Sequence, residues 1–174
     1  MIDKEGYRHG VGIILVNTNR QVFLAKRVGM QAWQFPQGGA KENETPEETM
    51  YRELKEEIGL HPEDITILSC SQKWLRYRLP SRLIRRYTKP LCIGQKQKWF
   101  LLCLTNPQAK IDLAATDDPE FDSWAWVSYW YPIKQVVTFK RKVYTLAMQE
   151  FAPLVLSRQF WERIGKSRGT PTTC

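Results

Sequence analysis

The sequence predicts a mixed α/β sandwich, and three observations lead to this fold class. Segments typical of strands come first, a well-delimited helix follows, and further strands precede a closing helix. The chain has 174 residues, of which 43% are hydrophobic and 25% charged, as expected of a globular domain with its own core. No segment approaches the ~18–20 consecutive apolar residues that span a bilayer. Composition therefore excludes a collagen, a fully disordered chain and a membrane-spanning helix.

The predicted strands fall on both sides of the central helix. Residues 7–16 alternate between apolar and other side chains, and the apolar run within residues 21–27 predicts their hairpin partner. Residues 33–35 predict a short extended segment that Pro36 and the following glycines end. Three later segments also predict strands: residues 65–79, 99–104 and 124–127.

Two helices and a tail complete the predicted organisation. The central helix follows Thr45, a suitable N-cap, has Pro46 at its first position, and ends at Gly59. Its apolar stripe consists of Met50, Tyr51, Leu54 and Ile58. Helical spacing returns over residues 139–156, and no periodicity follows it. These patterns predict a domain over 6–149, the end of the closing helix over 150–157, and a mobile C-terminal tail over 158–174.

The net charge of +8 comes from one part of the chain. Between Ile65 and Ile111 there are ten Lys and Arg residues and no Asp or Glu, whereas the rest has 16 basic and 18 acidic residues. A segregated positive field attracts polyanions such as nucleic acids. A solvated basic surface that keeps the protein soluble is the alternative.

Three carboxylates converge on one face of the central helix. Glu53, Glu56 and Glu57 stand at i, i+3 and i+4, where like charges cost roughly 0.2–0.5 kcal/mol per pair. A cation among the carboxylates relieves this repulsion, and Mg²⁺ and Mn²⁺ prefer oxygen ligands. The triad alone leaves a solvated acidic face as the alternative.

The span 38–60 around this triad follows a longer pattern. Gly38 is followed after five residues by Glu44, and after seven more by Arg52-Glu53-Leu54-Lys55-Glu56-Glu57-Ile58-Gly59-Leu60. The pattern resembles the signature of the Nudix hydrolases at each fixed position. This resemblance implies an α/β fold, an αβα sandwich with a mixed β-sheet, in which a loop-helix-loop motif holds divalent metal against a diphosphate. It also implies an enzyme that hydrolyses phosphoanhydride bonds.

The resemblance also implies roles for individual residues. More than one Mg²⁺ or Mn²⁺ ion would be held by the carbonyl of Gly38 and by the carboxylates of Glu53, Glu56, Glu57 and Glu120. The general base would be one of the helix carboxylates, such as Glu53, or Glu120 from a distant loop. For Glu120, a solubilising residue in a turn is the alternative. Arg52 would orient the carboxylates through charge-assisted hydrogen bonds.

Further peptides narrow the likeness to a branch of the family that acts on the 5′-polyphosphate ends of RNA or on dinucleoside polyphosphates. They are Tyr7-Arg8, Trp33-Gln34-Phe35-Pro36-Gln37-Gly38-Gly39, Trp74-Leu75-Arg76-Tyr77, residues 93–100 and residues 127–132. The likeness covers about residues 1–157 and departs from the branch at His9-Gly10, where Pro-Asn is expected.

The branch suggests a substrate, RNA with a 5′-triphosphate or 5′-diphosphate and an unpaired 5′ end. Conversion to 5′-monophosphate RNA would release pyrophosphate or phosphate and so promote mRNA decay. The interleaved basic and aromatic residues of 74–87, with Tyr77, Arg85 and Arg86 among them, suit a single strand. The resemblance adds Arg8, and places Arg27, Val137, Phe139 and Lys140 around a nucleobase. A core position in the closing helix is the alternative for Phe139.

Two other functions stay open. One is hydrolysis of dinucleoside polyphosphates, and the other, from a different class, is a non-catalytic RNA-binding or sensor protein on the same fold. The intact carboxylate triad argues against the second, because a binder of polyanions gains nothing from repelling carboxylates. Four cysteines without a CxxC pair, and an N-terminus without the pattern of a signal peptide, predict a cytoplasmic protein with reduced thiols. We expect a monomer that does not bind membranes.

Overall fold

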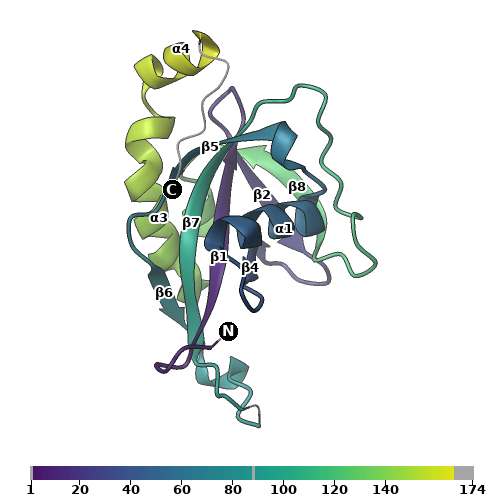
Figure 1. The fold of residues 1–174 in the computed structure, drawn as a ribbon, viewed down its shortest axis with the longest axis vertical. Helices are drawn as coiled ribbons and strands as arrows, with labels where there is room; N and C mark the ends of the chain where they lie inside the picture. Colours follow the sequence, from purple (N-terminus) through teal and green to yellow (C-terminus); the bar gives the residue numbers. More distant parts are fainter. Residues whose placement is uncertain (1, 88, 167–174) are drawn as a thin grey trace.

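The computed structural model describes residues 2–87 and 89–166 (Figure 1). Its centre is a parallel pair, β1 (Tyr7–Val16) and β7 (Gly94–Leu104), registered from Tyr7↔Gly94 to Val16↔Cys103. The eight-stranded sheet has the order β3-β2-β1-β7-β5, with β4 on β1, β6 on β7 and β8 on β2. The remaining strands are β2 (Val22–Arg27), β3 (Trp33–Gln34), β4 (Gln37–Gly39), β5 (Ile65–Cys70), β6 (Leu75–Arg78) and β8 (Phe121–Val127).

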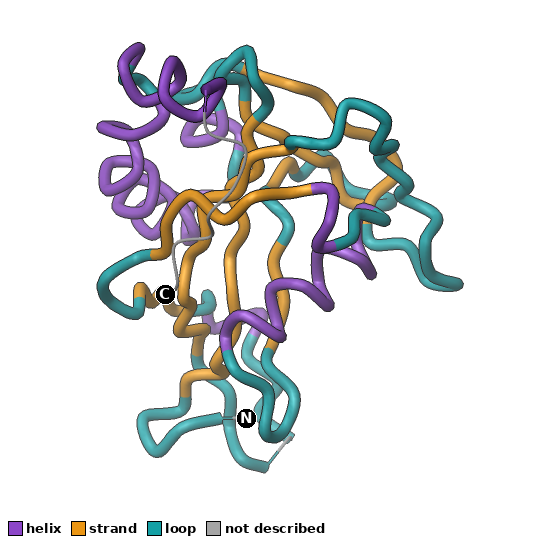
Figure 2. Tube along the Cα trace, turned by 45° about the horizontal axis from the view of Figure 1, so that its top comes forward, coloured by secondary structure: helices purple, strands orange, loops and turns teal. Residues whose placement is uncertain are grey.

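Helices cover both faces of the sheet (Figure 2). On one face α1 (Pro46–Ile58) packs on β1 through a cluster that includes Val11, Ile13, Met50, Leu54 and Ile58. On the other face α3 (Arg141–Val155) contributes to a cluster with Ile14, Val16, Tyr144, Met148 and Phe151. The alternation of β1 side chains between these clusters confirms the predicted αβα sandwich.

Local signals place α1 where the sequence predicts it. The Thr45 side chain accepts from the Glu48 N–H, and the Glu48 carboxylate accepts from the Thr45 N–H, which forms a capping box. At the other end Gly59 has φ 71°, and its N–H donates to the Lys55 carbonyl. A left-handed residue costs least when it is glycine, so the helix stops there.

The structure differs from the sequence prediction within the sheet. Residues 65–79 form two strands, β5 and β6, because Ser71 turns the chain: its N–H donates to the Trp99 carbonyl and its hydroxyl to the Lys73 carbonyl. Gln37–Gly39 forms β4 on β1, where the sequence suggests only a break. Strands β7 and β8 also begin earlier than predicted, at Gly94 and Phe121.

The segments around α3 also differ from the prediction. The closing helix begins at Arg141, and two short helices precede it: α2 (Pro132–Gln135) and the 3-10 helix η3 (Thr138–Lys140). The remaining 3-10 helices are η1 (Pro62–Asp64) and η2 (Ser81–Leu83). The hydroxyl of Tyr144 on α3 accepts from the Phe35 N–H at 2.9 Å. This bond ties the segment between β3 and β4 to the helix below it.

Within the predicted tail, residues 158–166 form α4 (Arg158–Lys166). The helix begins after Ser157, whose hydroxyl accepts from the Phe160 N–H, and Trp161 donates its indole N–H to the Val155 carbonyl at 2.7 Å. Trp161 also packs on the α3-side core. These tertiary contacts hold the helix against the α3 side of the sheet. Residues 167–174 lie outside the described part of the chain. Within the described residues, none of the helices is long and apolar enough to cross a membrane.

Candidate active site

Helix α1 presents its three carboxylates in two environments. Glu53 and Glu57 are on the buried side, with exposed fractions of 8% and 5%, while the Glu56 side chain is 41% exposed. Burial withdraws carboxylates from water and disfavours their charged form. The two buried groups therefore need compensation from the protein or from a bound cation.

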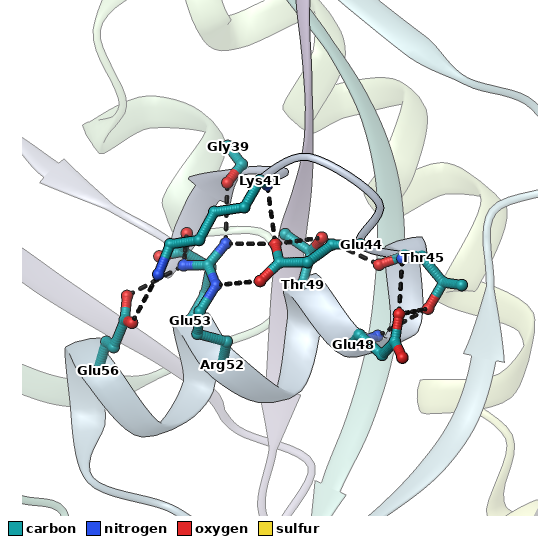
Figure 3. A network of polar contacts seen from close by, with 9 residues as sticks. All are labelled: Gly39, Lys41, Glu44, Thr45, Glu48, Thr49, Arg52, Glu53 and Glu56. Atoms are coloured by element: carbon teal, nitrogen blue, oxygen red, sulfur yellow. Dashed lines mark hydrogen bonds and ion pairs between the residues drawn. The ribbon is translucent and has the colours of Figure 1, made fainter. Parts of the chain in front are cut away.

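Arg52 provides part of this compensation (Figure 3). Its Nη1 donates to Glu53 Oε1 at 2.7 Å and to Glu56 Oε2 at 3.0 Å. Nε donates to Glu44 Oε1 at 2.6 Å, and Nη2 donates to Glu44 Oε2 at 2.8 Å and to the Gly39 carbonyl at 2.9 Å. All five donors of a guanidinium are thus engaged. The predicted contact of Arg52 with the helix carboxylates is present, and Glu44 is its partner on the preceding loop.

Of the two buried carboxylates, Glu57 receives the fewer hydrogen bonds and ion pairs to offset its burial. Its Oε2 accepts from the Gln37 N–H at 2.9 Å, whereas its buried Oε1 has no hydrogen-bond partner among the described residues. Burial, together with the charges of Glu120 and Glu53, raises the pKa of Glu57 well above the ordinary value of a glutamate. A buried acceptor without a partner is costly, and a cation would satisfy it.

Gly38 lies on β4, between β1 and the Glu53 carboxylate. In the antiparallel pairing of β4 with β1, Gly38 lies opposite Val11, and its carbonyl oxygen lies close to Gly10. The expected role of this carbonyl as a metal ligand stays a prediction. A side chain at Gly38 would overlap the Glu53 carboxylate, so this glycine provides the space in which Glu53 lies.

A cavity of about 390 Å³ opens beside β4 and Glu53. Glu120, which precedes β8, joins Glu53 in its wall, and its side chain pairs with Arg27 at 3.3 Å between Oε1 and Nη2. The charge of Glu120 raises the pKa values of both Glu53 and Glu57. The structure thus brings together carboxylates that lie more than 60 residues apart in sequence.

Cationic and aromatic side chains form the facing part of the cavity wall. Lys140 is buried, and its burial and the nearby charge of Arg27 lower the pKa of its ammonium to about 8. Its Nζ lies 5.7 Å from the centre of the Tyr77 ring, and the Phe139 ring lies 5.8 Å from that ring. The guanidinium of Arg8 lies close to Gly39, where a side chain would overlap it.

The cavity contains most, but not all, of the predicted site residues. Its lining includes Arg8, Arg27, Gly38, Glu53, Tyr77, Glu120, Phe139 and Lys140. The other predicted site residues are not in the lining: Arg52, Glu56, Glu57, Arg85, Arg86 and Val137. Leu79 and Leu83, from the segment that carries Arg85 and Arg86, do line it. Sequence reasoning missed Gln34, whose polar side chain is buried beside the cavity. The only local signal was a polar residue between the aromatic residues Trp33 and Phe35.

The donor set suits a hard divalent cation, but the carboxylates are not yet gathered around one position. Within residues 2–87 and 89–166, no three His, Cys, Asp or Glu side chains form a group ready to hold a metal ion. The contacts explain this: Glu53 and Glu56 turn toward Arg52, and Glu57 turns toward Gln37. Carboxylate oxygens are the ligands that Mg²⁺ and Mn²⁺ prefer, and Glu57 Oε1 is a buried acceptor available to one.

The family model of the NUDIX domain matches residues 6–148 of this chain. The chain therefore belongs to the Nudix hydrolase family, whose members generally depend on divalent metal ions. The expected class of activity, hydrolysis of phosphoanhydride bonds, is confirmed.

Similar curated proteins carry a more specific name. The chain is 59% identical over 158 residues to the RNA pyrophosphohydrolase of Pseudomonas paraeruginosa, covering 91% of this chain and 99% of that protein. It is also 59% identical over 169 residues to the RNA pyrophosphohydrolase of Shewanella sediminis, covering 97% and 98%.

Solved structures share the fold at low sequence identity. The E. coli dihydroneopterin triphosphate pyrophosphohydrolase aligns with a TM-score of 0.66 and 20% identity, covering 83% of this chain and 96% of that one. A C. elegans Ap4A hydrolase complex aligns with a TM-score of 0.64 and 18% identity, covering 86% and 98%. At these identities the likeness establishes the fold alone.

Proposed function

We propose that this chain converts 5′-triphosphate or 5′-diphosphate RNA to 5′-monophosphate RNA, releasing pyrophosphate or phosphate. The observation that carries the proposal is the cavity that Glu53 and Glu120 line together with Arg8, Arg27 and Lys140. A polyphosphate needs cations on its oxygens and carboxylates that position metal and water. Both are present in one cavity, and the 59% identical relatives are named for this reaction. Its biological consequence would be to expose messages to decay.

Glu53, Glu56 and Glu57, with Glu120, would hold one or more Mg²⁺ or Mn²⁺ ions. Such ions neutralise phosphate charge and lower the pKa of a bound water toward neutrality. To reach a shared position, Glu53 and Glu56 would exchange part of their contact with Arg52, which would keep Glu44 and Gly39. In this proposal, Gly38 contributes space for Glu53, and its carbonyl would be a further ligand.

The remaining residues divide between proton transfer and binding. Glu120 is suited to accept a proton at Oε2, because both of its polar contacts are made by Oε1. Arg8 and Arg27 would bind phosphate oxygens, as guanidinium groups do. Phe139, held against Tyr77, offers a ring to an unpaired base.

The RNA beyond its first nucleotides would follow the basic segment that leaves the cavity. Leu79 and Leu83 line the cavity, and the chain continues from them to Arg85 and Arg86. Positive charge along this path matches a phosphodiester backbone. Cys70, Cys92 and Cys103 are free thiols, which supports the proposal of a cytoplasmic protein.

The test offers the protein 5′-triphosphate RNA with an unpaired 5′ end and, in parallel, a dinucleoside tetraphosphate. Each is incubated with Mg²⁺, with Mn²⁺ and with excess chelator, and the products are resolved. We expect pyrophosphate or phosphate release from RNA that requires a divalent ion and is lost in Glu53→Gln.

Each other outcome identifies another function. A higher kcat/KM on the dinucleotide would establish a dinucleoside polyphosphate hydrolase. RNA binding without product release from either substrate would establish the sensor alternative. Glu63→Gln is the matched control, because Glu63 is an exposed glutamate on η1 away from the cavity.

A further inference from the structure

Gln34 is a buried polar residue beside the cavity without an assigned role. It lies on β3, its exposed fraction is 4%, and its amide makes hydrogen bonds to Lys140 and Glu120. The three residues come from separate parts of the chain, since Gln34 is 106 residues from Lys140 and 86 from Glu120. A buried amide is retained in a core only when its hydrogen bonds are satisfied, and here both ends are.

The chemistry of its neighbours fixes which way the amide points. The Lys140 ammonium can only donate, so the oxygen Oε1 must face it, at 3.1 Å from Nζ. This leaves the amide nitrogen Nε2 to face Glu120, where it donates to Oε1 at 3.4 Å. An ionised carboxylate can only accept, so the opposite amide orientation would lose both bonds. Lys140 therefore holds Gln34 in the orientation that binds Glu120.

Both contacts of Glu120 fall on the same carboxylate oxygen. Arg27 Nη2 lies 3.3 Å from Oε1, the oxygen that also accepts from Gln34. Oε2 has no partner among the described residues, while the charge of Glu120 acts on Glu53 and Glu57. Holding one oxygen fixes the plane of the carboxylate and leaves the second oxygen available to the substrate side.

We propose that Gln34 is a positioning residue that anchors Glu120 Oε1 so that Oε2 stays available in the cavity. This inference rests on the function proposed above, in which Glu120 acts on the proton of the attacking water or binds the metal. Arg27 is the more exposed of the two anchors, with 41% of its side chain exposed, and is the one expected to bind RNA. When Arg27 turns to a phosphate or base, Gln34 still holds Glu120, because its own anchor Lys140 is buried.

The kinetic test replaces Gln34 with methionine, which has a similar volume and no hydrogen-bonding amide. For 5′-triphosphate RNA, Gln34→Met should lower kcat about tenfold and leave KM within about twofold, because supporting contacts of this kind typically cost 10–100-fold. In a Glu120→Gln background the same change should cost no further activity. Gln149→Met, an exposed glutamine on α3, is the matched control and should retain wild-type kinetics.

A second variant separates positioning from packing. Gln34→Glu keeps an acceptor for Lys140 but cannot donate to Glu120 when ionised, so we expect a loss in kcat similar to that of Gln34→Met. A full kcat in Gln34→Glu would overturn the proposal. So would a tenfold loss that persists unchanged in the Glu120→Gln background, since Gln34 would then act on something else.

A crystal structure of each metal-free variant tests the inference without any activity. We expect the Glu120 carboxylate to rotate away from β3 in Gln34→Met and Gln34→Glu, while the backbone stays in place. A carboxylate that keeps its orientation in both variants overturns the positioning role whichever substrate the protein hydrolyses. If wild-type protein releases no phosphate from RNA, the proposed function fails, and the crystal structures still decide the role of Gln34.

Discussion

At the scale of the residue, Glu57 is the group whose environment is explained least by the protein itself. It is 5% exposed, accepts one hydrogen bond from Gln37, and leaves Oε1 without a partner. Leaving a buried acceptor unsatisfied costs about 1–3 kcal/mol, more for a charged group. Stability alone gives no reason to place a carboxylate there, so Glu57 is the residue that most directly indicates a bound cation.

The Glu57→Gln variant should lose turnover and keep its fold. We expect kcat on 5′-triphosphate RNA to fall about 10²–10³-fold or more, because one electrostatic contribution to the transition state is removed. Metal-free protein should be as stable as the wild type or more stable. The pKa of Glu57 is raised by folding, so its contribution to stability is present below the unfolded pKa and is lost as pH rises through the folded pKa.

The stability advantage of Glu57→Gln should therefore grow as the pH is raised from 4 to 8. Thermal unfolding in chelator and phosphate release at saturating Mg²⁺ measure the two effects. Turnover near the wild-type rate would exclude Glu57 as a metal ligand. Glu63→Gln, the same chemical change at an exposed position, should alter neither property.

The sequence could point to single residues where the information is local. Glu53, Glu56 and Glu57 follow from helical spacing and from the signature, and the contact of Arg52 with them follows from its adjacency. The contacts of Glu120 with Gln34 and of Gln34 with Lys140 cross about half of the chain. No local pattern contains them, so only the folded structure could identify Gln34. The carbonyl of Gly38 was assigned from the signature alone, and that assignment stays a prediction.

At the scale of the element, α1 and the loop before it form one unit. Glu44 accepts two hydrogen bonds from Arg52, one from Thr49 Oγ1 and one from the Lys41 N–H. These bonds favour the ionised carboxylate and lower the pKa of Glu44 to about 2. The contacts between the loop and the helix are therefore strongest while the Glu44 carboxylate is charged.

We expect these contacts of Glu44 to make the stability of the protein sensitive to acid. A carboxylate with a depressed folded pKa stabilises the protein above its unfolded pKa of about 4.5, and this contribution is lost as pH falls toward about 2. Glu44→Gln should be less stable than wild type at pH 7, and the difference should shrink steadily below pH 4.5. Urea unfolding at pH 7, 4 and 3 measures it, with Glu42→Gln as the exposed neighbouring control. A difference that stays constant over this range would contradict the assignment.

The sequence predicted best those elements whose first and last residues themselves indicate where the element begins and ends. Helix α1 has a capping box, a proline at its first position and a terminal glycine, all readable in sequence. Strand β4 has no such signal, and helix α4 has only Ser157 before its first residue. β4 exists because β1 offers it a pairing edge, and α4 because Trp161 contacts Val155 and the core. Tertiary contacts of this kind override local propensity.

At the scale of the whole molecule, the basic segment lies next to the cavity that holds Glu53 and Glu120, since Leu79 and Leu83 line that cavity. The segment around η2 is at the lower end of the molecule in Figure 1, while α4 lies at the upper end. Neutralising Arg85 and Arg86 together should weaken binding of an RNA of several nucleotides more than binding of a mononucleotide. The plot of log affinity against log salt should become shallower by about one unit per lost phosphate contact.

The matched control for this charge change lies on α4. Arg158→Gln with Arg163→Gln removes the same charge from the opposite end of the molecule and should leave the salt slope unchanged. If neutralising Arg85 and Arg86 changes neither slope nor affinity, the basic segment serves only solubility.

Substrate choice also belongs to the whole molecule, because RNA and a dinucleoside polyphosphate present similar phosphates to the same carboxylates. Discrimination must come from what lies beyond those phosphates. An unpaired base can stack on Phe139, which is half-buried, lines the cavity and lies against Tyr77. Stacking on an aromatic side chain contributes ~1–3 kcal/mol per base. A dinucleoside polyphosphate ends in two nucleosides and has no phosphodiester chain to place along the basic segment.

We therefore expect Phe139→Ala to lower kcat/KM on RNA by roughly 5- to 150-fold, the equivalent of that stacking energy, and to affect the dinucleotide less. RNA with a blunt, base-paired 5′ end should be a poor substrate, since its first bases cannot separate to reach the ring. Tyr131→Ala, which removes an exposed aromatic ring away from the cavity, is the control. Equal losses on both substrates, with full activity on blunt RNA, would show that Phe139 supports packing rather than recognition. The phosphates alone would then determine which substrate is hydrolysed, and the dinucleotide would be as good a substrate as RNA.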